Sequence, residues 1–427
     1  MYLVLNHNGS SAMSQVLNKK IVAAGAIGNV LEWYDFAVYG YFASSIGRVF
    51  FPKEDPIAQL LFAFGVFAIG YLMRPLGGML IGNIGDRVGR KQALSVSVAA
   101  MAIPTFIVGI LPGYDAIGLA APILLTLCRM LQGLSVGGEY TTSIVFMVEN
   151  APAKKRGIAG AFAGCGSVIG ILLGSATGTA LAALMPPESL DSWGWRIPFL
   201  LGLVIGFVGL LLRRNIEEKT NAIVKQKQPL IETLQNHRPL LARLAGLSVF
   251  NAVAFYLLFV YLVSWLQLED KVSQEISLQI NTISMLLLIP VMIASGALSD
   301  RIGRKPLLIG TLATAILFAY PLFNGMYHHS QMIVQLCQLG FSLLIGIYLG
   351  SSPAFMVESA PAHVRSTSIA LGYNLILGIV GGLTPLTATW LVHRTQSGVA
   401  PAFMIIAAAL ISLTTILLMR ETYKESL

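Results

Sequence analysis

Charged residues are scarce in this sequence, which excludes the classes of protein that keep a large surface in water. Only 11% of its 427 residues are Asp, Glu, Lys or Arg, whereas a soluble domain carries about 25%. Apolar residues make up 55% of the chain, and its mean hydropathy is +0.73. A monomer of this composition does not solvate itself in water, so the sequence predicts a protein of the lipid bilayer.

Cysteine is also scarce, and histidine is never paired with an acid inside an apolar run. Cys128, Cys165 and Cys337 all fall within apolar runs, so there is no disulfide framework and no zinc-type spacing. The six histidines fall in loops, termini or run ends: His7, His237, His328, His329, His363 and His393. No nucleophile elbow or phosphate loop is present. These absences exclude the common enzyme classes, and we expect no enzyme activity, no cofactor and no metal.

Long apolar runs, by contrast, are abundant. About 20 apolar residues are needed for one helix to cross a bilayer. Twelve such runs are centred near residues 33, 70, 103, 129, 170, 203, 253, 286, 316, 343, 379 and 408. The sequence therefore predicts an all-α polytopic membrane protein.

The net charge of +8 orients the chain rather than attracting a polyanion. If the N-terminus is cytoplasmic, the outer loops hold only Arg48, Lys53, Lys271 and Arg394 among the basic residues. The other basic residues then gather on the inner side, as the positive-inside rule requires. We expect both termini in the cytoplasm, contact with lipid and no nucleic-acid partner.

Two loop motifs occur twice in the same order. GNIGDRVGRK (Gly82–Lys91) returns 214 residues later as GALSDRIGRK (Gly296–Lys305), and VENAPAKKRG (Val148–Gly157) returns 209 residues later as VESAPAHVRS (Val357–Ser366). The chain is therefore a duplicated unit of roughly 210 residues. Duplicated membrane halves are typical of secondary transporters.

The repeated motifs supply candidates for a latch that holds one face of a carrier shut. An acid at the end of one span can accept hydrogen bonds from backbone amides where the next helix begins, and the adjacent bases can pair with acids of the partner loops. The alternative is that the bases serve membrane topology alone. The predicted latch residues are Gly82, Asp86, Arg87, Gly89, Arg90, Glu149, Arg156, Gly296, Asp300, Arg301, Gly303, Arg304, Glu358 and Arg365.

These motifs carry a family resemblance over nearly the whole chain. The doubled motif resembles the major facilitator superfamily, and further matches are GNVLEWYDFAVYG (Gly28–Gly40), YLMRPLGG (Tyr71–Gly78), RMLQGLSVGGEY (Arg129–Tyr140) and WGWRIPF (Trp193–Phe199). Together they resemble the metabolite:proton symporters, which include proline/glycine-betaine, α-ketoglutarate, citrate and shikimate carriers. The resemblance implies twelve transmembrane helices in two pseudo-symmetric six-helix bundles, proton-driven uptake through a bacterial inner membrane, and function as a monomer. The chain ends eight residues after Met419, so we expect no regulation through the coiled-coil tail of the osmosensing members.

Ionisable residues inside the predicted spans are the main functional candidates, because each costs at least ~2.5–3.5 kcal/mol at mid-bilayer. In the first span, Glu32 and Asp35 share a helix face with Asn29 and Tyr39. In the fourth span, a stripe at helical spacing is formed by Arg129, Gln132, Val136 and Glu139. Lipid offers no hydrogen bonds, so both stripes turn inward, and we expect them to face one another.

The hypothesis for coupling is that Glu32 and Asp35 lie near Arg129 and that at least one carboxylate exchanges a proton. Substrate arriving at Arg129 weakens its hold on the acid, which couples protonation to binding. The alternative is a permanent ion pair that joins the two spans. Glu139 has two equal interpretations, a coupling residue or a helix-end charge, and Arg74 is interpreted as structural or as a latch partner.

The second half offers polar rather than charged candidates for the substrate site. They are Asn251, Tyr256, Tyr261, Asn281, Tyr373 and Asn374. Tyrosine rings suit a cation–π contact with an ammonium group, although interhelical packing explains each residue equally well. Together with Asn29, Tyr39, Arg129 and Gln132, these side chains are the predicted substrate-binding set.

The predicted organisation has five parts: an N-terminal extension (1–18), a first six-helix bundle (19–214), a cytoplasmic linker (215–238), a second six-helix bundle (239–420) and a short tail (421–427). We predict a proton-coupled symporter that imports a small polar metabolite. One clear buried base favours a zwitterion such as proline or betaine; a second base in the pocket would favour a di- or tricarboxylate.

Overall fold

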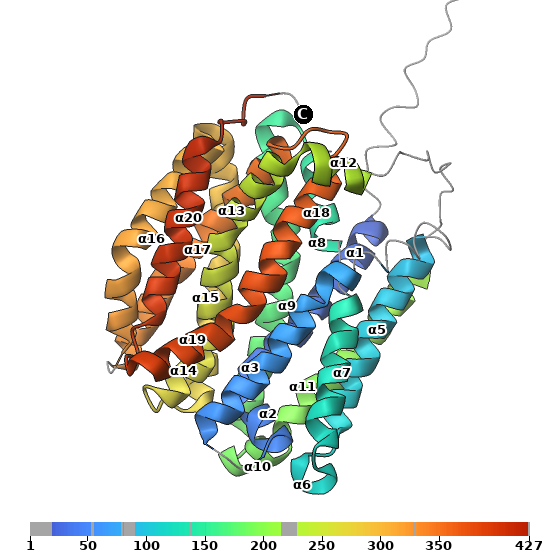
Figure 1. The fold of residues 1–427 in the computed structure, drawn as a ribbon, viewed down its shortest axis with the longest axis vertical. Helices are drawn as coiled ribbons and strands as arrows, with labels where there is room; N and C mark the ends of the chain where they lie inside the picture. Colours follow the sequence, from blue (N-terminus) through green and yellow to red (C-terminus); the bar gives the residue numbers. More distant parts are fainter. Residues whose placement is uncertain are drawn as a thin grey trace, which may run out of the picture.

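A computed structural model describes residues 19–52, 55–77, 80, 90–135, 139–149, 151–214, 229–327 and 330–425. This part of the chain is helical, with no strand. Figure 1 shows the helices of the first half gathered on one side and those of the second half on the other. The predicted extension (1–18), most of the predicted linker (215–228) and the motif residues Gly82, Asp86, Arg87 and Gly89 lie outside the described residues.

The first half runs from the start of α1 to the end of α11. Its long helices are α1 (Lys19–Tyr41), α3 (Pro56–Leu72), α5 (Arg90–Ile110), α7 (Ala120–Ser135), α8 (Glu139–Glu149), α9 (Arg156–Leu184) and α11 (Ile197–Arg214). Shorter elements between them are α2 (Ala43–Phe50), α6 (Tyr114–Ile117), η1 (Ala153–Lys155), α10 (Pro187–Ser192) and η2 (Gly194–Arg196).

The second half follows a short helix, α12 (Pro229–Asn236), which falls inside the predicted linker. Its elements are α13 (Arg238–Tyr256), η3 (Leu257–Tyr261), α14 (Leu262–Leu268), α15 (Gln274–Ile302), α16 (Arg304–Met326), α17 (Gln331–Glu358), α18 (Arg365–Ile376), η4 (Leu377–Gly381), α19 (Gly382–Thr395) and α20 (Pro401–Leu418). The start of α1 lies at the same end of the molecule as the C-terminus (Figure 1), which we call the tail end.

The twelve predicted spans correspond one to one to helical rods. Among the described residues, eight stretches are long and apolar enough to cross a membrane, and three shorter apolar helices cover Ser95–Ile110, Ala120–Ser135 and Gly194–Val208. The remaining rod is α1. The prediction of an all-α polytopic membrane protein is therefore confirmed.

Helix ends are encoded locally. Asp55 accepts a hydrogen bond from the Ile57 amide at 3.3 Å, and Pro56 occupies the first helical position of α3, a pairing of cap and proline that starts helices. Gly303 turns the chain sharply between α15 and α16 at a φ of 101°, a conformation that glycine adopts without steric cost.

Two of the rods, the seventh span and the eleventh, each contain one π-helical turn. In the seventh span this turn is η3, directly after Tyr256, and in the eleventh it is η4, which begins four residues after Tyr373. Such insertions are rare and occur often at functional sites. Tyr256, Tyr373 and Leu377, at or near these two segments, line the candidate site described below.

The two halves meet along α9, which packs against α15 and α17, and along α3, which packs against α19. Glycines allow the closest approach. A Cβ atom on Gly296 would lie 2.7 Å from the Gly157 carbonyl oxygen, and one on Gly157 would lie 2.7 Å from Nη1 of Arg304. Side chains larger than hydrogen are therefore excluded where α9 crosses α15.

Candidate functional site

Two buried ion pairs lie side by side in the first half. Nη1 of Arg129 is 2.6 Å from Oδ2 of Asp35, and both side chains are fully buried. Nη2 of Arg74 pairs with Oε1 of Glu32, and these side chains are also buried. Glu32 and Asp35 lie on α1, Arg129 on α7, and Arg74 just beyond α3 in the span Pro56–Gly77.

The Asp35 carboxylate is held by three donors. Besides Arg129, Oδ1 accepts from Oγ1 of Thr105 at 2.7 Å and from Nε2 of Gln132 at 2.8 Å. Arg129 also donates to Oε1 of Gln132 at 2.9 Å, and its guanidinium lies 4.4 Å from the centre of the Tyr39 ring. The structure thus brings the stripes of the first and fourth spans together at Asp35 and Arg129, as the sequence predicts.

Glu32 has a different partner from the one expected. Its carboxylate accepts from Arg74, whose guanidinium lies among three aromatic rings: 4.8 Å from Tyr71, 5.5 Å from Phe36 and 5.7 Å from Trp33. Of the two interpretations of Arg74, the ion pair with Glu32 favours the structural one over a latch partner and makes Arg74 a second buried base of the core. Its Nε and Nη1 atoms have no hydrogen-bond partner among the described residues.

A central cavity lies between the halves, and the ring of Trp33 in its wall is 5.7 Å from the guanidinium of Arg74. Its volume is about 20 Å³, which is room for about one water molecule. Aromatic rings from both halves dominate its wall, together with Ser167 and Asn251; these rings belong to Trp33, Tyr140, Phe255, Tyr256 and Tyr373.

The rings of the wall contact one another. The Trp33 ring centre is 6.0 Å from that of Phe255 and 6.3 Å from that of Tyr256, with the latter pair stacked. Tyr140 stacks on Tyr373 at 5.2 Å. We call these five rings the aromatic wall. The Tyr256 hydroxyl donates to the Tyr71 hydroxyl at 2.9 Å, which connects the wall to the surroundings of Arg74.

Only part of the predicted substrate-binding set lies at this cavity. Tyr256 and Tyr373 line it, as does Asn251, which donates to the Tyr373 hydroxyl at 3.3 Å. Asn29 lies behind it and donates to Ser167 Oγ at 3.0 Å.

The other members of the set lie elsewhere. Gln132 and Arg129 belong to the Asp35 network, and Tyr39 donates to the Ala63 carbonyl at 2.9 Å. Tyr261, Asn281 and Asn374 do not line the cavity. The side chain of Glu139 lies outside the described residues.

Three wall residues, Trp33, Tyr140 and Phe255, were missed by sequence reasoning. Trp33 and Tyr140 lie inside the motif stretches Gly28–Gly40 and Arg129–Tyr140, next to the charged residues Glu32 and Glu139. Burying an aromatic side chain in a membrane span costs no free energy, so the residue type alone does not indicate a site. The only signal in the sequence is that Trp33 is next to Glu32 and Tyr140 is next to Glu139.

The second copy of the latch motif joins the halves at the tail end. Asp300 at the end of α15 accepts hydrogen bonds from the amides of Gly157 and Ile158, at 2.7 and 3.0 Å. These amides belong to the first turn of α9, where the helix dipole favours an anion. Gly303 makes the turn that follows, and Arg301 is exposed.

The bases of this end bind acids on both sides of the boundary. Arg304 holds Glu358 with two hydrogen bonds, of 3.2 and 3.0 Å, and also lies 2.8 Å from Asp300. Arg365 donates across the halves to Glu149 at 2.5 Å. Arg156 donates at 2.8 Å to the carbonyl of Glu425 in the tail rather than to a side-chain acid. Arg90 begins α5, and its side chain lies outside the described residues.

The opposite end holds a recess of about 530 Å³ between α2, α10 and α14, with Arg48, Gln59, Asp191, Gln267 and Glu275 in its lining. Further contacts join the two halves between this recess and the central cavity. Asn281 donates to Ser175 Oγ at 3.1 Å, and the Phe64 and Tyr261 ring centres are 6.0 Å apart. Ser175 lies two helical turns beyond the cavity residue Ser167. Contacts between the halves therefore lie on both sides of the cavity.

Comparison with known proteins identifies the family to which this architecture belongs. The profile of the Major Facilitator Superfamily matches residues 26–385. The proline/betaine transporter of Escherichia coli K12 is 35% identical over 96% of this chain and 85% of that protein. A glycine betaine/proline/ectoine/pipecolic acid transporter of Dickeya dadantii is 36% identical over 96% of this chain and 84% of that protein.

Solved structures show the same fold at low identity. A D-xylose-proton symporter superposes with a TM-score of 0.77 at 19% identity, covering 96% of this chain and 99% of that one. The xylose transporter of E. coli in a partially occluded inward-open conformation gives 0.75 at 20% identity, with the same coverage. These relatives and neighbours are membrane transporters and not enzymes, and the chain belongs to the Major Facilitator Superfamily.

Proposed function

We propose that this protein is a proton-coupled symporter that imports a zwitterionic amino acid or betaine across a bacterial inner membrane by alternating access, with both termini in the cytoplasm. The names of the relatives in E. coli and D. dadantii support the substrate class, and the proton-symporting fold neighbour supports the coupling. The charge asymmetry of the loops supports the orientation.

One observation carries the substrate class: the aromatic wall stands beside a buried arginine with free donors. A cation over the face of Trp or Tyr gains about 2 kcal/mol or more when it is desolvated. The five rings of the wall therefore suit an ammonium group. Nε and Nη1 of Arg74, behind Trp33, have no partner among the described residues and suit the carboxylate of the same substrate.

The charge balance of the site favours a zwitterion over a di- or tricarboxylate. Although Arg74 is a second buried base, it is neutralised by Glu32, just as Arg129 is neutralised by Asp35. The two pairs together carry no net charge. An electrically neutral zwitterion enters such a site without leaving an uncompensated charge, whereas a dianion would bury at least one.

The same geometry supports different roles for the two carboxylates. Asp35 keeps three donors, so we infer a permanent ion pair with Arg129. Glu32, by contrast, accepts its hydrogen bond from Arg74. A substrate carboxylate that binds Arg74 weakens this bond, and Glu32 then takes up a proton, which travels with the substrate.

The cavity of about 20 Å³ is too small for such a substrate, so binding requires the halves to separate. The contacts of Asp300 and Arg365 with the first half would hold the tail end shut while the opposite end opens, and would break in the other half of the cycle. This motion is the alternating access expected of two rigid bundles around a fixed site.

Transport by the purified protein in proteoliposomes tests the proposal. Radiolabelled glycine betaine, proline, α-ketoglutarate and citrate are each exchanged against the same compound without label, and an imposed proton gradient is added in a second series. We expect counterflow with the two zwitterions and accumulation driven by an inward proton gradient. Exchange of citrate or α-ketoglutarate but not of the zwitterions would overturn the substrate class, and accumulation that ignores the gradient would overturn the coupling.

A further inference from the structure

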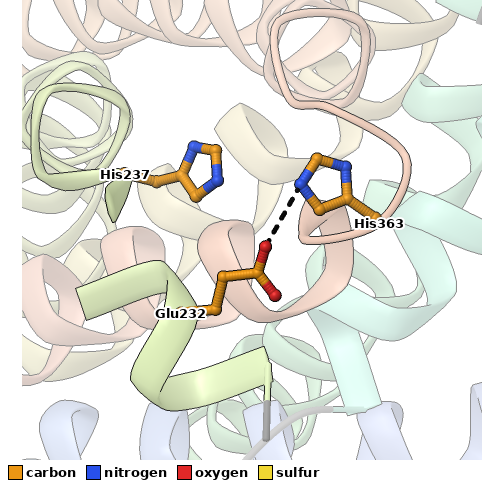
Figure 2. Close-up of side chains that lie close together, drawn as sticks. All are labelled: Glu232, His237 and His363. Carbon is orange, nitrogen blue, oxygen red and sulfur yellow. Dashed lines mark ion pairs between the residues drawn. The ribbon is translucent and has the colours of Figure 1, made fainter. Parts of the chain in front are cut away.

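Two histidines and one glutamate meet at the tail end, away from the central cavity. Glu232 lies on α12, His237 directly precedes α13, and His363 lies in the loop between α17 and α18. Figure 2 shows the two imidazole rings and the carboxylate turned toward one another. Nothing in the proposed transport mechanism uses these three side chains.

The distances suit a common ligand. Nε2 of His363 is 3.6 Å from Oε1 of Glu232, and one ligand atom from each residue lies within 4.8 Å of the other two. Zinc bonds of 2.0–2.2 Å in a tetrahedron place ligand atoms about 3.3 Å apart. The side chains of His363 and Glu232 are 60% and 42% exposed, so small rotamer changes close the remaining gap.

We propose that Glu232, His237 and His363 bind a divalent transition-metal ion such as Zn²⁺, with water in the fourth position. Two imidazoles and one carboxylate form a known zinc ligand set. The nitrogen donors favour Zn²⁺, Ni²⁺ or Cu²⁺ over Ca²⁺ and Mg²⁺, which prefer oxygen ligands only. The sequence spacing conceals the site, since His363 lies 126 residues beyond His237.

The position of the site suggests that a bound ion affects opening of the tail end. α12 is the last element before the second half, and its Thr233 is fully buried. His363 lies two residues before Arg365, which binds Glu149 of the first half. A bound ion ties α12 to the loop that leads to Arg365 and so holds the backbone beside the Arg365–Glu149 contact, which joins the halves. It therefore slows opening of the tail end, a consequence that rests on the proposed transport function.

Metal binding is measured first, on the full-length protein in detergent, purified through a tag without histidine. The starting variant carries His7→Gln, His328→Gln, His329→Gln and His393→Gln, so that only the cluster histidines remain. Zn²⁺ is titrated by calorimetry, and Ca²⁺ serves as the control ion. Further variants add His363→Gln, His237→Gln or Glu232→Gln, and circular dichroism verifies their helix content.

We expect one Zn²⁺ per chain in the starting variant and no heat from Ca²⁺. Each added substitution should weaken binding by more than the 10–100-fold that loss of an outer-shell partner costs. Absence of Zn²⁺ binding in the starting variant would overturn the site, as would unchanged affinity in the His363→Gln variant. Neither result depends on whether the protein transports betaine.

The mechanical consequence is tested separately by counterflow in proteoliposomes, with the substrate that the transport assay identifies. Zn²⁺ should slow exchange by the starting variant and leave the His363→Gln variant unaffected, because only the former retains the three ligands. Equal inhibition of both, or inhibition of neither, would refute the clamp even where binding itself is observed.

Discussion

The carboxylate of Asp300 accepts a hydrogen bond from the backbone amide of Gly157, 2.7 Å away. An acid of the second half thereby binds the first turn of a helix that belongs to the first half. This contact joins two rigid bundles through a helix terminus, and it can form only when the tail end is closed. Its removal should therefore shift the equilibrium between the closed and open tail end.

Replacing Asp300 with alanine should favour the open tail end. A carboxylate at a helix start contributes about 0.5–2 kcal/mol, so the population ratio should change by about 2-fold to 30-fold. Spin labels at the exposed positions Lys154 and Ala362 report the separation of the halves by pulsed electron resonance. Glu275→Ala at the opposite end is the matched control. An unchanged distance distribution in Asp300→Ala would refute a latch role.

Gly157→Ala should prevent full closure of the same end. The added Cβ would lie 2.7 Å from Nη1 of Arg304 and closer still to Ser299 and Gly296, so α9 and α15 must move apart. We expect slower counterflow together with a longer distance between the same labels. Gly310→Ala is the control, because a Cβ there meets no atom within 4 Å and alanine improves a helix by up to about 1 kcal/mol. Normal closure in Gly157→Ala would contradict the packing argument.

The two ion pairs should respond differently to neutralisation. Asp35→Asn leaves the fully buried Arg129 without its counter-charge, which costs about 3–5 kcal/mol, and should lower the melting temperature and the yield of folded protein. Glu32→Gln should cost less, since Arg74 keeps its contacts with three rings. It should retain substrate exchange but lose acceleration by a proton gradient.

Thermal unfolding, counterflow and substrate-induced proton uptake separate these outcomes. Proton uptake that persists in Glu32→Gln but disappears in a folded Asp35→Asn protein would reverse the assignment. Full coupled uptake by both variants would exclude both carboxylates from proton transfer.

Trp33→Leu should weaken binding of a quaternary ammonium substrate. Loss of a desolvated cation–π contact of about 2 kcal/mol corresponds to about a 30-fold increase in the half-saturating concentration of glycine betaine. Phe62→Leu, at an exposed aromatic side chain on α3, is the control and should leave it unchanged. Equal affinities in wild type and Trp33→Leu would show that the aromatic wall does not contact the ammonium group.

Several features of this molecule follow from local sequence because they depend on local physics. A run of apolar residues must form a helix in lipid, where every backbone group needs an internal partner, so the twelve rods are readable from composition. The meeting of Asp35 with Arg129 also follows, because both lie on polar stripes at helical spacing that must turn away from lipid.

Other features depend on distances that no spacing in the chain reveals. Glu32 lies on the same stripe as Asp35, yet it binds Arg74 from another span because the arrangement of α1 and α3 brings that arginine within reach. The aromatic wall draws on both halves, and an aromatic ring in an apolar span looks like packing until its neighbours are known. The latch motif, by comparison, was visible through its duplication, although its cross-half partners were not.

The sequence by itself determined the class of this protein: a duplicated, twelve-span carrier whose few buried charges must face inward, because hydrocarbon penalises each exposed charge and each unsatisfied backbone group. Only the tertiary structure decided that Glu32 pairs with Arg74, which rings line the cavity and which contacts join the halves at the two ends. Pairing across helices depends on how the rods cross and rotate. That geometry arises from side-chain packing between residues far apart in the chain, as where Gly157 and Gly296 allow α9 to touch α15.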